Sequence, residues 1–95
     1  MKMKLFRSIL GLSLLTVGTS AMAAFSIDEL QLAAATALDD FKQSNPDHVQ
    51  HFTGYKAWNS GEDSKVKVYV AHDGMNMEFN YLCMKHDASI ACHAQ

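Results

Sequence analysis

Basic residues are scarce in this sequence, and they are concentrated at its start. Lysines and arginines number 8 against 10 aspartates and glutamates, and three of the eight (Lys2, Lys4 and Arg7) stand near the beginning of the chain. From residue 24 onward, five lysines face ten acidic residues, a net charge of about −5 with neutral histidines. Nucleic-acid-binding domains and polybasic membrane-surface modules carry a basic face. The charge therefore argues against both classes.

Long apolar runs are also missing, since a membrane-spanning helix needs about 20 apolar residues. The apolar stretch over residues 8–17 is interrupted by Gly18, Thr19 and Ser20. Its basic start and the small-x-small sequence Ala21-Met22-Ala23 are typical of a secretory signal peptide. We therefore predict a signal peptide over residues 1–23 and a periplasmic or secreted protein, with no membrane contact after cleavage.

The segment after the predicted cleavage site has the pattern of an amphipathic helix. Ser26 and Glu29 fit a capping box, in which a hydroxyl and a carboxylate satisfy the first backbone amides of a helix. The helix should end before Pro46, because the residue preceding a proline avoids helical geometry. Apolar residues recur at three- and four-residue spacing, which predicts one buried stripe: Ile27, Leu30, Ala34, Ala37, Leu38 and Phe41.

From Lys65 the apolar period changes to two, which is typical of a half-buried strand. Asp73-Gly74 follows, and this pair is a strong signal for a two-residue hairpin turn. The turn sets the register: it places apolar residues of the first strand opposite apolar residues of the second. The expected partners are Val70 with Met77, Val68 with Phe79 and Val66 with Tyr81, while Lys67, Tyr69, Asn76, Glu78 and Asn80 form a more polar opposite face.

Cysteine occurs only twice, and an exported chain favours a disulfide between Cys83 and Cys92. If Asp87-Ala88 forms the next two-residue turn, the two cysteines lie directly opposite each other on neighbouring strands. A bridge between them would remove the thiolate needed for a cysteine–histidine nucleophile with His86 or His93.

The residues between helix and hairpin complete the predicted fold. Residues 49–58 are aromatic and β-branched enough for a strand, with a bulge at Gly54, and residues 59–64 read as a polar loop. A single proline and an apolar content of 48% argue against disorder. We predict one small α+β domain over residues 24–95, an N-terminal helix packed on a three- to four-stranded antiparallel meander. This element order is similar to the topology of cystatin-like folds, although the glutamine-valine-glycine hairpin of cystatins has no match in residues 59–64.

Catalytic motifs are absent from the sequence. No nucleophile-elbow pattern and no phosphate-binding glycine loop occurs. The adjacent carboxylates Asp39-Asp40 and Glu62-Asp63 are most simply explained as solvated surface. We therefore predict that the protein is not an enzyme and has no cofactor; the alternative for the cofactor is copper.

Histidine and methionine residues beside the predicted hairpin turn suggest a metal site. In the predicted register, His72 lies opposite Met75, and Met77 is diagonal to His72; such neighbours are about 5 Å and 7–8 Å apart at Cβ. One imidazole with two thioethers suits Cu(I), a soft ion. The stretch from His72 to Met77 resembles the His plus Met-x-Met ligand set of periplasmic copper-efflux metallochaperones, without the tryptophan of that set. Because Met75 and Met77 share a face with Val70 and Phe79, however, the pattern favours core packing.

Two further histidine groupings are weaker. Asp47, His48 and His51 would share an ion only on a helix, and Pro46 followed by a strand pattern favours a loop instead. His86 and His93 fall about 13 Å apart in the predicted register, at about 3.3 Å per residue.

The aromatic residues Tyr55, Trp58 and Tyr69 suggest a patch for a protein partner, since aromatic side chains anchor such interfaces. The negative charge suits a basic partner, such as a lysozyme-like hydrolase or a toxin. The alternative is that Tyr55 and Trp58 complete the core under the helix, which we favour for Trp58. The leading prediction is an exported, non-enzymatic binding module, of inhibitor or immunity type. The alternative function is a periplasmic copper-binding protein that uses His72, Met75 and Met77.

Overall fold

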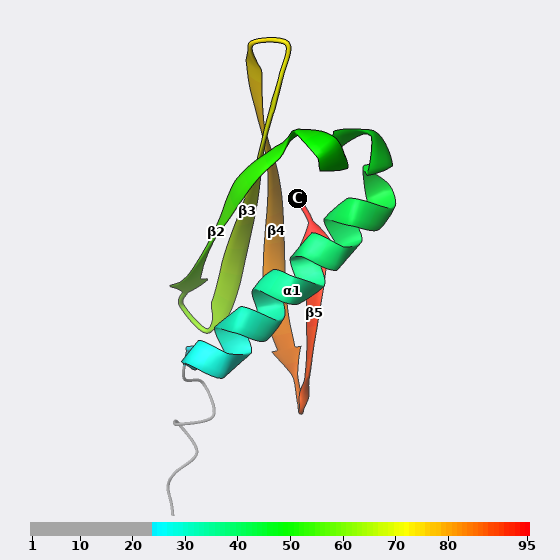
Figure 1. Cartoon of the computed structure of the whole chain (residues 1–95). Helices are drawn as coiled ribbons and strands as arrows, with labels where there is room; N and C mark the ends of the chain where they lie inside the picture. The colour runs from blue at the N-terminus through cyan, green and yellow to red at the C-terminus, as the bar shows by residue number, and fades with distance from the viewer. Residues whose placement is uncertain (1–23) are drawn as a thin grey trace, which may run out of the picture.

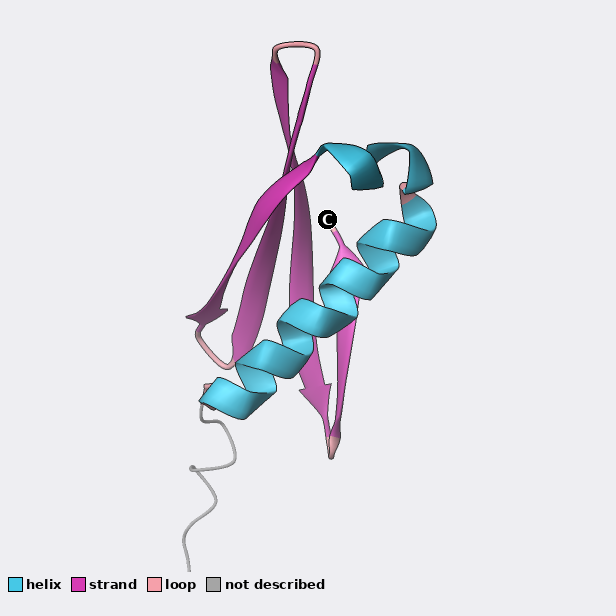
Figure 2. Ribbon diagram, in the orientation of Figure 1, coloured by secondary structure: helices cyan, strands magenta, loops and turns pink. Residues whose placement is uncertain are grey.

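A computed structural model describes residues 24–95 (Figure 1), so the predicted signal peptide over residues 1–23 lies outside the described residues. One helix packs on a four-stranded antiparallel sheet with strand order β2-β3-β4-β5 (Figure 2). This confirms the predicted α+β fold. The elements are α1 (Ile27–Ser44), the 3₁₀ helix η3 (Pro46–His51), β2 (Phe52–Ser60), β3 (Asp63–His72), β4 (Met75–His86) and β5 (Ser89–Ala94).

The predicted capping box begins α1. The Glu29 amide donates to the Ser26 hydroxyl at 3.1 Å, and the Ser26 amide donates to the Glu29 carboxylate at 2.9 Å. Just before the helix, the backbone of Phe25 exchanges two hydrogen bonds of 3.0 and 3.1 Å with the side-chain amide of Asn59 in β2. The start of α1 is therefore anchored to the sheet as well as capped.

The helix α1 crosses one face of the sheet (Figure 1), and its apolar side chains close the core. Phe41 meets Phe79 edge-to-face, with ring centroids 5.1 Å apart. Ile27 was predicted to be buried but is 79% exposed; it is the first helical residue and lines an open surface pocket with Tyr55 and Ala57 of β2. The buried core residues are Phe25, Ala33, Ala34, Ala37, Phe41, Val66, Val68, Val70, Tyr81 and Cys83.

The β3–β4 hairpin has the predicted register, with Val70 opposite Met77, Val68 opposite Phe79 and Val66 opposite Tyr81. Both turn residues, Asp73 and Gly74, have positive φ, at 52° and 75°. This is the requirement of a type I′ turn, which an Asp-Gly pair meets at little cost. Local turn chemistry and apolar alternation thus specify the same pairing.

The segment between α1 and the hairpin departs from the prediction at both ends. Residues 49–51 belong to η3 rather than to a strand, because Pro46 starts a helical turn that continues to His51. The predicted loop over residues 59–64 shrinks to the turn Gly61-Glu62, since Gly61 supplies a φ of 66° and lets β2 and β3 pair up to the turn. The expected bulge near Gly54 is confirmed by a register shift between Phe52 and Gly54.

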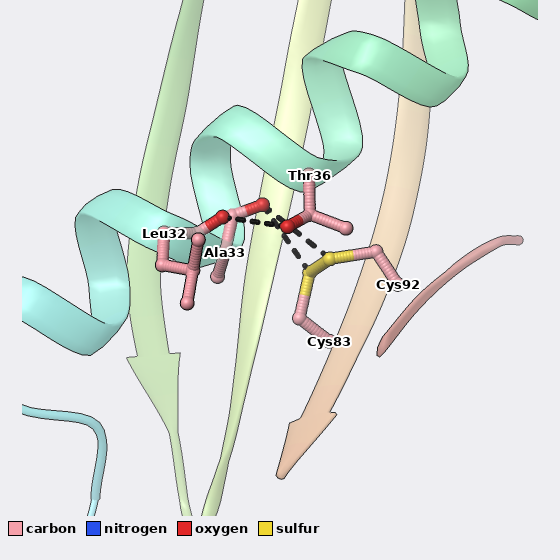
Figure 3. Close-up of a disulfide and its surroundings, with 5 residues drawn as sticks. All are labelled: Leu32, Ala33, Thr36, Cys83 and Cys92. Atoms are coloured by element: carbon pink, nitrogen blue, oxygen red, sulfur yellow. Dashed lines mark hydrogen bonds between the residues drawn. A yellow bond between two sulfur atoms is a disulfide. The ribbon is translucent and has the colours of Figure 1, made fainter. Parts of the chain in front are cut away.

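The disulfide joins Cys83 of β4 to Cys92 of β5, which are direct partners in the register with Cα atoms 4.0 Å apart. The predicted turn at Asp87-Ala88 is confirmed. The Ala33 carbonyl oxygen of α1 lies 3.9 Å from the sulfur of Cys83 and 3.4 Å from that of Cys92 (Figure 3). Because bridged sulfurs carry no proton, these are packing contacts. The helix backbone rests directly on the disulfide.

Two ionisable groups that join α1 to the sheet have shifted pKa values. Hydrogen bonding to the Ser26 backbone, and then the Lys85 ammonium 3.2 Å away, lower the pKa of Glu29. Burial, with a smaller contribution from Asp40, raises the pKa of Tyr81 to about 12. Both groups secure the packing of helix on sheet.

Candidate functional site

One face of the sheet is left open by the elements of residues 24–95. Both α1 and η3 lie on the same side of the sheet (Figure 2). Side chains alternate between the faces of a sheet, so the buried valines of β3 identify the helix side and their neighbours identify the other. We call that other side the outer face; its larger residues are Lys56, Trp58, Asp63, Lys65, Lys67, Tyr69, Asn76, Glu78, Asn80, Leu82, Met84, His86 and His93.

The outer face is ordered in rows across the strands. Trp58 lies opposite Lys65, which lies opposite Leu82. In the next row Lys56 lies opposite Lys67, and Tyr69 follows one row further. Lysines therefore stand between the two aromatic residues of this face.

Two contacts show how the lysines are held. The Lys56 ammonium lies 5.0 Å from the centre of the Trp58 ring, a cation–π distance. The Lys67 ammonium lies 3.1 Å from the Glu78 carboxylate, which is 51% exposed.

An open groove of about 310 Å³ lies on this side, and its lining includes Trp58, Lys65, Lys67, Asn80 and Gln95.

Charge is divided unevenly between the two sides of the molecule. The outer face carries three lysines and two carboxylates (Asp63 and Glu78), a net charge of +1. The other eight carboxylates of residues 24–95 lie on α1, on η3 and in the turns, with two lysines, a net charge of −6. The aromatic residues of the outer face thus lie on the more positive of the two sides of the molecule.

The structure separates the three aromatic residues predicted to bind a partner. Trp58 and Tyr69 lie on the outer face and are half-buried. Tyr55 is three residues before Trp58, so it points to the helix side, where it is 51% exposed beside the start of α1. The interpretation that Tyr55 and Trp58 complete the core is wrong, because neither residue belongs to the buried cluster.

The residues predicted to bind copper lie near the tip of the hairpin. His72 and Met75 are direct partners in the register, as predicted. Met75 is 65% exposed, so its assignment to the core is wrong, because the hairpin extends past the end of the helix layer (Figure 1). Met77 is half-buried and packs against the core.

Sequence reasoning missed a second imidazole beside this group. His51 is the last residue of η3, and its ring centroid lies 3.8 Å from that of His72. The sequence predicted a loop followed by a strand for residues 47–51, so this contact, which the 3₁₀ helix creates, was not expected. His48 packs elsewhere, against Phe79 with centroids 5.5 Å apart. Over residues 24–95, no three side chains drawn from His, Cys, Asp and Glu are grouped as a metal site.

The cysteines offer no nucleophile in the oxidised protein. Both are bonded to each other, and no free cysteine occurs among the described residues. Cys83 is fully buried against α1. A cysteine–histidine pair with His86 or His93 therefore cannot form while the bridge is intact.

Comparison with known proteins adds no assignment: the chain matches no family model, no curated protein and no solved structure. Within residues 24–95, no helix has the length and apolar character needed to cross a membrane. The disulfide is compatible with an exported protein.

Proposed function

We propose that the protein is a small periplasmic or secreted binding module without catalytic activity, and that its outer face binds the surface of a partner protein. An inhibitor or an immunity-type protein would act in this way. The proposal rests on one observation: the face that α1 and η3 leave open carries Trp58 and Tyr69 with three lysines around them.

The proposal has a physical basis in the different roles that aromatic and charged residues have in protein interfaces. Trp and Tyr supply large apolar area with few rotatable bonds, which makes them frequent energetic anchors. Lysines beside such anchors accelerate association and select partners by charge. Both aromatic residues stand on paired strands rather than loops, so little order has to be gained when a partner binds.

The local charge also indicates the chemistry of the partner. The net charge of the whole domain predicted a basic partner, and the acidic helix side suits one. The outer face has the opposite sign, so we propose an acidic protein surface as its ligand. Lys65 and Lys56, both exposed, are the residues best placed to pair with carboxylates of the partner.

The test begins with capture of partners from periplasmic extract and culture medium by the protein purified from cells that express the full chain. Captured proteins are then purified and their affinities measured at increasing salt. We expect an acidic partner whose affinity falls with salt and is lost in Trp58→Ala and in the triple variant Lys56→Ser/Lys65→Ser/Lys67→Ser. Lys42→Ser, which removes an exposed lysine on α1, is the matched control and should bind normally.

A single-stranded oligonucleotide is the necessary comparison, because aromatic residues among lysines also bind such strands. Tight binding of the oligonucleotide, with no acidic protein captured, would contradict the proposal. Equal loss of affinity in Lys42→Ser and in the outer-face variants would also contradict it, since the attraction would then depend on overall charge.

A further inference from the structure

Two chain segments that are distant in sequence, the end of η3 and the tip of the β3–β4 hairpin, meet on the helix side of the sheet. His51 ends η3, His72 ends β3, and Met75 begins β4 across the two-residue turn. The rings of His51 and His72 lie 3.8 Å apart between centroids, inclined by 42°. The two imidazoles can each direct one nitrogen to a shared ion once the rings turn apart, because η3 packs on β3, the strand that ends at His72.

The contact between His72 and Asp73 suits a metal ligand. Its Nε2 lies 3.0 Å from the Asp73 carboxylate. In the neutral imidazole, an Nε2–H that donates to Asp73 leaves the lone pair on Nδ1. Metal-bound histidines commonly have such a carboxylate on the other ring nitrogen, which fixes the tautomer and strengthens the ligand. The contact with Asp73 therefore leaves the Nδ1 lone pair of His72 available to coordinate a metal ion.

Thioether sulfur is available on the same side of the hairpin. Met75 is the direct cross-strand partner of His72, which places their Cβ atoms about 5 Å apart. Met77 is the diagonal neighbour, about 7–8 Å away, and a methionine side chain spans such a gap. At 65% exposed, Met75 makes few packing contacts that coordination would have to break.

We propose that His51, His72 and Met75 bind one Cu(I) ion, with Met77 as an additional sulfur ligand. Thioether with imidazole is a soft donor set, and soft donors select Cu(I) over Zn(II). Among residues 24–95, no group of three His, Cys, Asp or Glu side chains is placed to hold a metal ion, so the thioethers complete the site and determine the ion. The site lies on the helix side of the sheet and does not depend on the outer face.

The test uses purified oxidised protein and Cu(I) supplied with ascorbate, which leaves the disulfide intact, in competition with a chromophoric Cu(I) chelator. Ag(I), monitored by NMR of the imidazole and methionine methyl signals, is a redox-inert second probe. We expect one Cu(I) per chain with a Kd below about 1 μM. Shifts should be confined to His51, His72, Met75 and Met77.

The variants separate ligation from ring packing. His51→Phe and His72→Phe keep an aromatic ring, so a purely structural contact would tolerate them, whereas we expect submicromolar binding to disappear. Met75→Leu should weaken Cu(I) binding and leave any Zn(II) binding unchanged. Asp73→Asn, suited to the positive φ of that position, should lower the affinity by about tenfold or more.

Matched controls are His86→Phe and Met84→Leu, at the far end of β4 and on the outer face respectively. Both should bind Cu(I) like the parent protein. Absence of submicromolar Cu(I) binding would overturn the proposal. So would full retention of Cu(I) binding in His51→Phe, or Zn(II) binding tighter than Cu(I) binding. Thermal unfolding of each variant without metal verifies that loss of binding is not loss of fold.

Discussion

Removal of the disulfide by Cys83→Ala/Cys92→Ala should destabilise the domain strongly. The bridge closes a ring of residues 83–92, and the loop-entropy relation for a ring of about ten residues gives about 2.7 kcal/mol. Unfolding entropy scales with chain length, so for the residues from 24 onward this corresponds to a fall in Tm of about 15–20 °C. Alanine is the appropriate substitution because Cys83 is fully buried, and a serine would add an unsatisfied hydroxyl there.

The assay is thermal unfolding followed by circular dichroism, with the purified protein in oxidised form, in a strong thiol reductant, and as the double variant. The reduced protein and the variant should melt at similar temperatures, well below the oxidised protein. The reductant should leave the Tm of the variant unchanged, which is the internal control. A Tm within a few degrees of the oxidised protein would refute the reasoning, because helix and sheet packing would then suffice without the bridge.

Two further predictions concern the attachment of α1 to the sheet. Ser26→Ala removes the cap hydroxyl and should lower the free energy of unfolding by about 1 kcal/mol in urea titrations, whereas Ser26→Asp, another capping residue, should restore it. The pKa of Tyr81 is raised from 10.0 to about 12, so folding favours its protonated form, and stability should fall as the pH rises from 10 to 12. Tyr81→Phe should remove that part of the loss; an unchanged alkaline unfolding profile would contradict the assignment.

The hairpin and the cysteine pairing were predictable because local signals agree with one another. Val66, Val68 and Val70 alternate with polar residues, and Asp73-Gly74 fixes where the chain reverses. A slip of one residue would turn every valine to solvent, so the register has one low-energy solution. The same count carries on to Cys83 and places Cys92 opposite.

Features that depend on how elements pack were not predictable. The residues from Val49 to His51 have the composition of a strand, yet the turn begun at Pro46 continues through them. The contact between His51 and His72 follows from that turn alone. The exposure of Met75 depends on where the helix layer ends, which the sequence around Met75 does not indicate.

Net charge gave incomplete information about the candidate surface for a related reason. The net charge of the chain does not distinguish the two faces of a sheet. The acidic residues of α1 outweigh the lysines of the outer face in that sum. The more polar face of β3 and β4 was predicted correctly, but Trp58 was assigned to the core. The pairing of β2 with β3 places Trp58 on that polar face, opposite Lys65.

Site-specific photo-crosslinking tests the central claim most directly. Benzoylphenylalanine is introduced in place of Tyr69 on the outer face, or in place of Leu32, which is 50% exposed on the solvent side of α1, and the cells producing each variant are irradiated. We predict a discrete adduct with an acidic protein from position 69, abolished by Trp58→Ala, and no such adduct from position 32. An adduct from position 32 alone, or an adduct from position 69 that persists in Trp58→Ala, would contradict the proposed binding face.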